Sequence, residues 1–285
     1  MEWWRQLPFA INPNILSIGS FYIRYYGLMY IFAFASFFFL TLYRLKTEKK
    51  KCSLTREQLE SFMMYVIAGI MAGGRLGYVL FYDLKYYLAN PAKIILPFYF
   101  SEGKLIYTGL SGMSYHGGLI GTVIVTILFC RIKKINFTDF TDFIIPAIPL
   151  AYTFGRIGNF INGELYGRIT SFGLGMYFPL DPEKKLRHPS QLYEAFFEGI
   201  LLFLILWLLR KKLSLRHSFL GLYIFFYGFF RFFIEFVREP DSQLGFILGP
   251  FTMGQILCFI MMLAGISLIA YNKLKLGNAA ANKTA

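Results

Sequence analysis

Long apolar runs, separated by shorter polar segments, dominate the pattern of this sequence. A membrane-spanning helix needs about 20 mostly apolar residues, and seven runs come close to that length. In chain order they are Tyr22–Tyr43, Phe62–Tyr82, Gly112–Cys130, Phe143–Ile161, Leu192–Leu209, Leu220–Val237 and Phe251–Tyr271. The runs are too long and too evenly apolar for the alternating strands of a membrane β-barrel. The pattern therefore predicts an all-α polytopic membrane protein, in which residues 1–275 form one integral domain with seven transmembrane helices.

Basic residues between the runs predict the orientation of these helices. Lysine and arginine concentrate in the short segments after the first, third, fifth and seventh runs, and they are fewer and more spread out elsewhere. Because short cytoplasmic loops carry an excess of Lys and Arg, we expect the N-terminus outside and the C-terminus in the cytoplasm. The longer segments 83–111 and 162–191 then form a small head region on the outer face. The small, polar residues 276–285 predict a disordered tail.

Composition narrows the class of protein further. Charged residues make up only 16% of the chain, against about 25% in soluble proteins. The net charge of +13 would indicate a nucleic-acid partner for a soluble chain, but here the basic residues flank apolar runs. We therefore expect membrane lipids, and no nucleic acid, as partners. The cysteines Cys52, Cys130 and Cys258 lack paired spacing, so we expect neither a thiolate metal site nor a cofactor.

Charged residues inside a membrane helix are costly, so each one is a candidate for function. In the sixth run, Tyr227, Arg231, Glu235 and Arg238 recur at helical spacing and share one face. Such a face cannot point at lipid. One interpretation is an Arg231–Glu235 pair that only neutralises itself. The other interpretation is that two arginines and one glutamate leave one positive charge unpaired, which a bound phosphate would match.

The end of the fourth run offers a second arginine near the outer interface. Arg156 can present a planar fork to phosphate oxygens, and Asn159, Asn162 and Glu164 follow it closely. The alternative is a helix that packs through Gly155 and neighbouring glycines, with an arginine that snorkels outward. The concentration of polar residues favours a site.

The third run begins with a possible catalytic residue. Ser111 or Ser114 can cap this helix, which places His116 in its first turns, where the helix dipole disfavours an imidazolium. A structural role for His116 stays open. In the second run, Arg75 lies among glycines, where a buried ion pair and a ligand contact are equally open. Tyr26, near the outer end of the first run, fits an ordinary interfacial anchor.

Taken together, these residues predict a cavity in the outer leaflet that binds an anionic lipid headgroup. The sequence contains no Ser–His–Asp or Cys–His nucleophile set, which disfavours a hydrolase with a covalent enzyme intermediate. An anionic-phospholipid transporter or flippase is the main alternative, and a lipid-binding scaffold is a third. A transporter would need polar residues through to the inner leaflet, whereas Leu201–Leu209 is plain hydrocarbon.

Several motifs also resemble a known family. The stretch Gly155–Gly167, with the sequence GRIGNFINGELYG, is similar to the signature of the bacterial prolipoprotein diacylglyceryl transferases. Further similar stretches are Tyr25–Tyr30, Gly74–Tyr82, His116–Gly121, His188–Glu194 and Arg231–Asp241. The resemblance extends over nearly the whole chain, in the same order.

This resemblance implies a seven-helix enzyme of the bacterial inner membrane. Its reaction moves the diacylglyceryl group of phosphatidylglycerol to the lipobox cysteine of a preprolipoprotein, forming a thioether and releasing glycerol phosphate, the first step of lipoprotein maturation. The implied catalytic residues are His116 and Arg231, and Arg156 binds the headgroup. The other substrate-binding residues expected are Tyr26, Arg75, Asn159, Glu164, Tyr227 and Glu235. We hypothesise that His116 accepts the thiol proton of the substrate.

Overall fold

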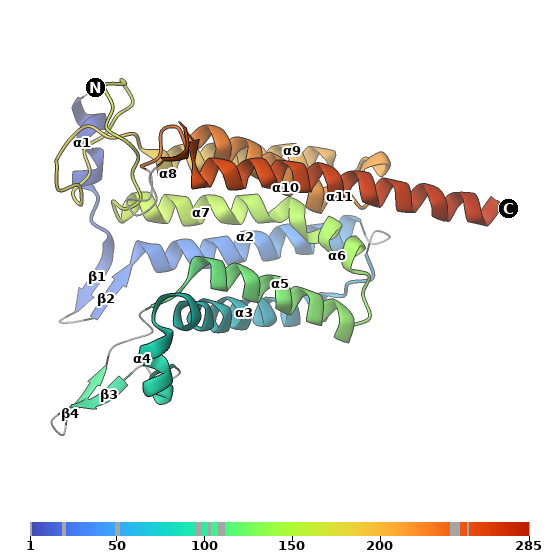
Figure 1. The fold of residues 1–285 in the computed structure, drawn as a ribbon, viewed down its shortest axis with the longest axis horizontal. Coiled ribbons are helices and arrows are strands. Elements are labelled where there is room, and N and C mark those ends of the chain that lie inside the picture. The colour runs from blue at the N-terminus through green and yellow to red at the C-terminus, as the bar shows by residue number, and fades with distance from the viewer. Residues whose placement is uncertain are drawn as a thin grey trace. The chain divides into compact units, whose positions relative to one another are not determined.

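The structure, a computed structural model, describes residues 2–18, 21–48, 52–94, 98–101, 104–107, 112–239, 246–249 and 251–284 (Figure 1). By its internal contacts the chain separates into two compact units. The first unit comprises Met1–Lys51 and Thr141–Ala285, and the second comprises Cys52–Phe140. Ser111, one of the two expected helix caps, and Asp241, the end of the last motif, lie outside the described residues.

The first unit is a bundle of helices with two small hairpins. Its elements are α1 (Glu2–Ala10), β1 (Asn14–Ile18), β2 (Phe21–Arg24), α2 (Tyr25–Thr47), η2 (Ile145–Ala147), α7 (Ile148–Ile161), α8 (Ser190–Glu194), the π-helical turn η3 (Ala195–Leu201), α9 (Leu202–Leu209), η4 (Leu213–Leu215), α10 (Phe219–Ile234), β5 (Phe246–Leu248), β6 (Phe251–Thr252) and α11 (Met253–Thr284). Helix α7 packs against both α2 and η3, and α10 packs along α11 (Figure 1).

The second unit is a helical hairpin. Its elements are α3 (Arg56–Tyr82), α4 (Leu84–Ala89), η1 (Pro91–Ile94), β3 (Phe98–Ser101), β4 (Lys104–Tyr107) and α5 (Tyr115–Ile132), and α6 (Phe137–Ile144) connects it to the first unit. Helix α3 begins with a capping box, in which the Thr55 side chain accepts from Gln58 N and the Gln58 side chain accepts from Thr55 N. The three two-stranded hairpins of the described residues were not part of the all-α prediction, because each is too short to show as a strand pattern.

Among the described residues, five helices are long and apolar enough to cross a membrane. They are Tyr25–Thr47, Arg56–Tyr82, Tyr115–Ile132, Ser190–Leu209 and Met253–Lys275, while Phe219–Ile234 is apolar but shorter. The expected span Phe143–Ile161 is interrupted, because Pro146 and Pro149 lack backbone N–H donors and divide it into α6, η2 and α7. Helix α11 also continues to Thr284, through residues expected to be disordered. The chain is thus mostly helical and polytopic, and seven spans stay a prediction.

Glycines bring α3 and α5 into direct backbone contact. A Cβ placed on Gly73 would meet Gly117 O and lie 2.8 Å from Gly121 Cα, and one on Gly77 would lie 2.6 Å from Gly117 Cα. These glycines recur every fourth residue on both helices, which is the small-residue spacing of close helix pairs in membranes. Gly69 completes the row on α3 against Gly121.

The loop between α7 and α8 folds with α1 around a small apolar core. Phe160, Met176 and Phe178 are buried there, and Trp4 and Leu7 of α1 pack against them. The Trp4 indole donates to Leu174 O at 3.1 Å. The first helix is therefore held against the head by both packing and hydrogen bonding.

A buried ion pair closes the same loop. Arg187 Nε and Nη2 each donate to one oxygen of Asp181 at 3.0 Å, and Arg187 Nη1 donates to Glu239 at 3.0 Å. Burial alone would raise the pKa of the Asp181 carboxyl. Hydrogen bonds from Arg187 and from the backbone of Lys185 and Glu183 outweigh it and hold that pKa below its ordinary value.

A second set of buried charges links the C-terminal end of α2 to the C-terminal end of α9. Glu48 accepts from Arg44 Nη2 at 2.8 Å and from Arg210 Nε at 3.0 Å, and Arg44 Nη1 also donates to Phe143 O. Both arginines belong to the basic segments from which the orientation was predicted. Their burial shows that these two also have a structural role.

We predict that Gly73→Ala destabilises the helical hairpin by about 1–3 kcal/mol, because the new methyl group overpacks the α3–α5 contact. Thermal unfolding of the purified protein in detergent would measure this as a lower melting temperature. Gly155→Ala is the matched control, since a Cβ at Gly155 meets nothing within 4 Å. Equal melting temperatures for the two variants would contradict the close packing.

We predict that Asp181→Asn lowers the stability of the head by about 3 kcal/mol at pH 7, because it breaks a buried ion pair. A carboxyl with a lowered folded pKa stabilises above its unfolded pKa, about 3.9, and this contribution is lost as the pH falls through the folded pKa. The difference between wild type and variant should therefore shrink below about pH 4. Limited proteolysis of the head across this pH range would measure it, with the half-exposed Glu183→Gln as control.

Candidate active site

Two arginines from different helices share one carboxylate oxygen inside the first unit. Arg156 of α7 approaches Glu194 Oε2 through Nε at 2.9 Å, and Arg231 of α10 approaches the same oxygen through Nη1 at 3.1 Å. The Glu194 side chain is 1% exposed, whereas those of Arg156 and Arg231 are 16% and 12% exposed. Glu194 therefore lies deeper than the two guanidinium groups that it joins.

A tyrosine and a second glutamate extend this pairing. Arg156 Nε donates to the Tyr152 hydroxyl at 2.7 Å, and that hydroxyl donates to Glu198 Oε2. The other oxygen, Glu198 Oε1, lies 3.7 Å from Arg231 Nη1. The same hydroxyl lies 3.3 Å from Glu194 Oε2. Since a phenol has only one hydrogen to donate, its closer contact with Glu198 leaves Glu194 Oε2 mainly to the two arginines.

Amide side chains continue the site toward the head. Arg156 Nη1 donates to Asn159 Oδ1 at 3.3 Å, and Asn159 Nδ2 donates to Glu164 Oε1 at 2.8 Å. Asn162 Nδ2 donates to the same Glu164 oxygen at 3.2 Å. The polar stretch that follows Arg156 in the sequence is thus one connected hydrogen-bond chain.

The helix face predicted for the sixth run is correct for Arg231 and Glu235 and wrong for Arg238. Glu235 pairs with Arg231 Nη2 at 3.4 Å and accepts from Thr252 Oγ1 at 3.2 Å. Helix α10, however, ends at Ile234, so Arg238 lies beyond it. There Arg238 forms a β-bridge with Gly167 and its carbonyl accepts from Arg168 Nε at 2.7 Å.

Two of the expected tyrosines, Tyr26 and Tyr227, belong to the same unit as the arginines. Tyr26 packs against α7 at Gly158, where a Cβ would lie 2.9 Å from the ring, and its hydroxyl is 3.1 Å from that of Tyr30. The Tyr227 ring meets the Tyr152 ring edge-on, with centroids 5.9 Å apart. Tyr227 therefore lies beside Tyr152 of the cluster, while Tyr26 lies against α7 at Gly158.

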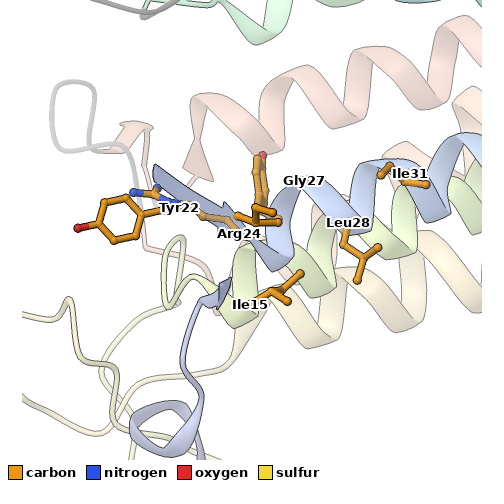
Figure 2. A pocket seen from close by; sticks show the side chains of 8 residues that line it. Ile15, Tyr22, Arg24, Gly27, Leu28 and Ile31 are labelled. Carbon is orange, nitrogen blue, oxygen red and sulfur yellow. The ribbon is translucent and has the colours of Figure 1, made fainter. Parts of the chain in front are cut away.

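An open cavity of about 520 Å³ is lined in part by Tyr26, at the start of α2. Figure 2 shows it between the β1–β2 hairpin and the first turns of α2, with Ile15 and Leu28 among its lining. Apart from Tyr22, Arg24 and Tyr26, its lining is apolar.

His116 and Arg75 belong to the second unit. The Ser114 side chain accepts from Gly117 N at 3.3 Å and caps α5, which leaves His116 exposed in the first turn. Arg75 donates from Nε to Ile94 O at 2.9 Å and from Nη2 to Lys93 O at 2.6 Å. These bonds to backbone carbonyls anchor Arg75, and its expected contact with substrate stays a prediction.

The positive charge that we expected to remain in the sixth run is matched by the protein itself. Glu194 and Glu198, distant in sequence, supply the matching negative charge, so the expectation of a positive surplus in the unliganded chain was wrong. Sequence reasoning missed Glu194, Glu198 and Tyr152 as site residues. Two acidic residues four positions apart within an apolar run were the signal, because buried carboxylates need partners.

In the part of the chain that the structure describes, five helices are able to span a bilayer, and arginines pair with carboxylates of other helices. These features define a multi-pass membrane protein with a buried ionic cluster. Comparison with known proteins makes this assignment more specific. The model of the prolipoprotein diacylglyceryl transferase family matches residues 13–271, and the chain belongs to that family.

Similar proteins cover nearly the full chain. A phosphatidylglycerol–prolipoprotein diacylglyceryl transferase of Chlorobaculum tepidum is 50% identical over 277 residues, which is 97% of this chain and 95% of the relative. Proteins of the same name from Rickettsia bellii and Nitratidesulfovibrio vulgaris are 46% and 45% identical, each over 91% of this chain and 94% of the relative.

Proposed function

We propose that this protein transfers the diacylglyceryl group of phosphatidylglycerol to the lipobox cysteine of a preprolipoprotein. The observation that carries this proposal is the pair Arg156 and Arg231, converging on one buried oxygen from two helices. An oxygen of a phosphodiester has the charge and the acceptor geometry to take that place. Family membership and the names of the relatives support the same reaction.

The chemistry needs no nucleophile from the protein. The cysteine sulfur attacks the carbon of the diacylglyceryl group that carries the phosphate. A C–S bond forms as the C–O bond to the phosphate breaks, and glycerol phosphate leaves with the bonding electrons. Arg156 and Arg231 stabilise the charge that grows on the departing phosphate in an interior of low dielectric. The buried cysteines Cys52, Cys130 and Cys258 therefore have no part in the step.

A base for the thiol proton completes the proposal. A free thiol has a pKa of about 8.5 and is mostly protonated at pH 7, so a proton acceptor accelerates the reaction. We assign this role to His116, on the family resemblance of its motif and on its exposed place in the first turn of α5. Tyr26, Asn159, Glu164, Tyr227 and Glu235 complete the substrate-binding set.

The membrane arrangement is proposed from the charge pattern. We infer seven spans in the bacterial cytoplasmic membrane, with the N-terminus outside and the site toward the outer leaflet, because the short basic loops favour the cytoplasm. The interrupted fourth span, α6 to α7, and the shorter α10 then complete the five long helices. The transporter and scaffold alternatives are not favoured by family membership.

The direct test combines purified protein, phosphatidylglycerol and a lipobox peptide, read by mass spectrometry. A mass gain of one diacylglyceryl group on the peptide cysteine, absent when that cysteine is serine, is the expected result. An unmodified peptide, together with movement of labelled phosphatidylglycerol between leaflets, would replace the transferase with the transporter.

We predict that Arg231→Lys strongly lowers the transferase activity, because an ammonium group lacks the planar fork that binds two oxygens. The expected loss is about 10²–10³-fold in kcat, measured with the peptide assay. Arg56→Lys, in an exposed pair on α3, is the control and should keep full activity. Full activity of Arg231→Lys would refute bidentate binding.

We predict that His116→Gln lowers kcat by about 10²–10⁴-fold, as expected when a general base is removed. His217→Asn serves as control, because His217 has a φ of 62° that asparagine tolerates and it lies outside the proposed site. A normal rate for His116→Gln would assign the proton to another group.

A further inference from the structure

Two buried polar atoms of the cluster face each other without a hydrogen bond. Among the described residues, Glu198 Oε1 and Arg231 Nη1 are both shielded from solvent and neither makes a hydrogen bond, although Arg231 Nη1 is ion-paired with Glu194 Oε2 at 3.1 Å. They lie 3.7 Å apart, too far for a good hydrogen bond between them. Buried polar atoms are rarely left this way, because each costs free energy.

The Glu198 carboxylate is held in this position from both sides. Its other oxygen accepts from the Tyr152 hydroxyl, and its backbone belongs to the π-helical turn η3. Thr153 of α7 packs against Gly199 in that turn, and its hydroxyl donates to Ala195 O at 3.4 Å. Glu198 Oε1 is therefore fixed toward Arg231 rather than free to rotate.

Glu198 Oε1 and Arg231 Nη1 need different hydrogen-bond partners. A carboxylate oxygen only accepts hydrogen bonds and a guanidinium nitrogen only donates them, whereas a hydroxyl does both. A phosphate oxygen next to Glu198 Oε1 would meet like charge. A hydroxyl group can accept from Arg231 Nη1 and donate to Glu198 Oε1, and so satisfies both atoms.

The burial of the side chains indicates which part of a bound lipid headgroup would contact which residue. Glu198 is 0% exposed, while Arg231 and Arg156 are 12% and 16% exposed. A lipid phosphate bound at the two arginines would thus carry its headgroup alcohol toward the deeper Glu198. Of the two parts of phosphatidylglycerol, the headgroup glycerol is the part that ends in free hydroxyls.

We propose that Glu198 is a specificity-determining residue, whose Oε1 accepts a hydrogen bond from a hydroxyl of the headgroup glycerol. This inference rests on the proposed function. It assigns to Glu198 the selection of hydroxyl-bearing headgroups among anionic phospholipids, because a buried acceptor left unpaired rejects a headgroup without a hydroxyl.

The test compares phosphatidylglycerol with phosphatidylpropanol of the same acyl chains, whose propyl headgroup has no hydroxyl. We expect wild-type kcat/KM in the peptide assay to favour phosphatidylglycerol by about 10-fold or more, the loss for one unpaired charged acceptor. In Glu198→Gln, the amide oxygen keeps the Tyr152 bond and the amide NH₂ replaces Oε1. The preference should then fall to about 3-fold or less.

Glu48→Gln is the matched control, since Glu48 is also a buried, arginine-paired carboxylate but belongs to the other cluster. Its preference ratio should equal that of the wild type. Glu198→Asp, which keeps the charge one methylene further back, should give an intermediate ratio and serves if Glu198→Gln does not fold. Equal loss on both lipids in the Glu198 variants would refute headgroup selection and leave a structural role, as would a wild type that does not discriminate.

Competitive binding of the two lipids, measured by native mass spectrometry without peptide, separates this inference from the proposed function. A wild-type binding preference that disappears in Glu198→Gln supports the role of Glu198 even if no peptide is modified. Peptide modification with no binding or rate preference would keep the transferase and overturn the inference.

Discussion

The carboxylate of Glu194, shared by two arginines from different helices, is the interaction on which the rest of the site depends. Isolated charges in an apolar interior cost several kcal/mol each, so neither arginine could be buried alone. Glu194 lets α7 and α10 carry their arginines to the same point. Removing this one group would take from Arg156 the carboxylate that it pairs with, and would leave Arg231 to Glu198 and Glu235 alone.

The surrounding contacts orient the guanidinium groups before any ligand arrives. Tyr152 and Asn159 bind Arg156, and Glu198 directs the Tyr152 hydrogen away from the shared oxygen. Donors that are already aimed lose little free energy by reorganising when charge develops on a phosphate. Carboxylates that neutralise the arginines in the unliganded protein also set a threshold, because an anion must compete with Glu194 for them. Strong and selective binding of a lipid headgroup then requires hydrogen bonds to the groups around the arginines as well as a negative charge.

Much of the architecture could be predicted from apolar runs, since a bilayer admits only long apolar helices. The Ser114 cap and the glycine rows on α3 and α5 follow local rules and are visible in the sequence. The interruption near Pro146 was missed, because the run is apolar throughout and only the missing donors divide it. The small hairpins were missed because a few residues carry no detectable strand period.

By itself, the sequence determined which residues are costly to bury, and therefore that Arg156, Arg231 and Glu235 need partners inside an apolar bundle. It also determined the family, through motifs that extend along nearly the whole chain. Only the tertiary structure decided the partners. Glu194 and Glu198 are about 40 residues from Arg156 and Arg231 in the chain, and helix packing, not spacing, brings their carboxylates to the arginines. Local periodicity orients a side chain on its own helix, but it holds no information on which other helix that face will meet.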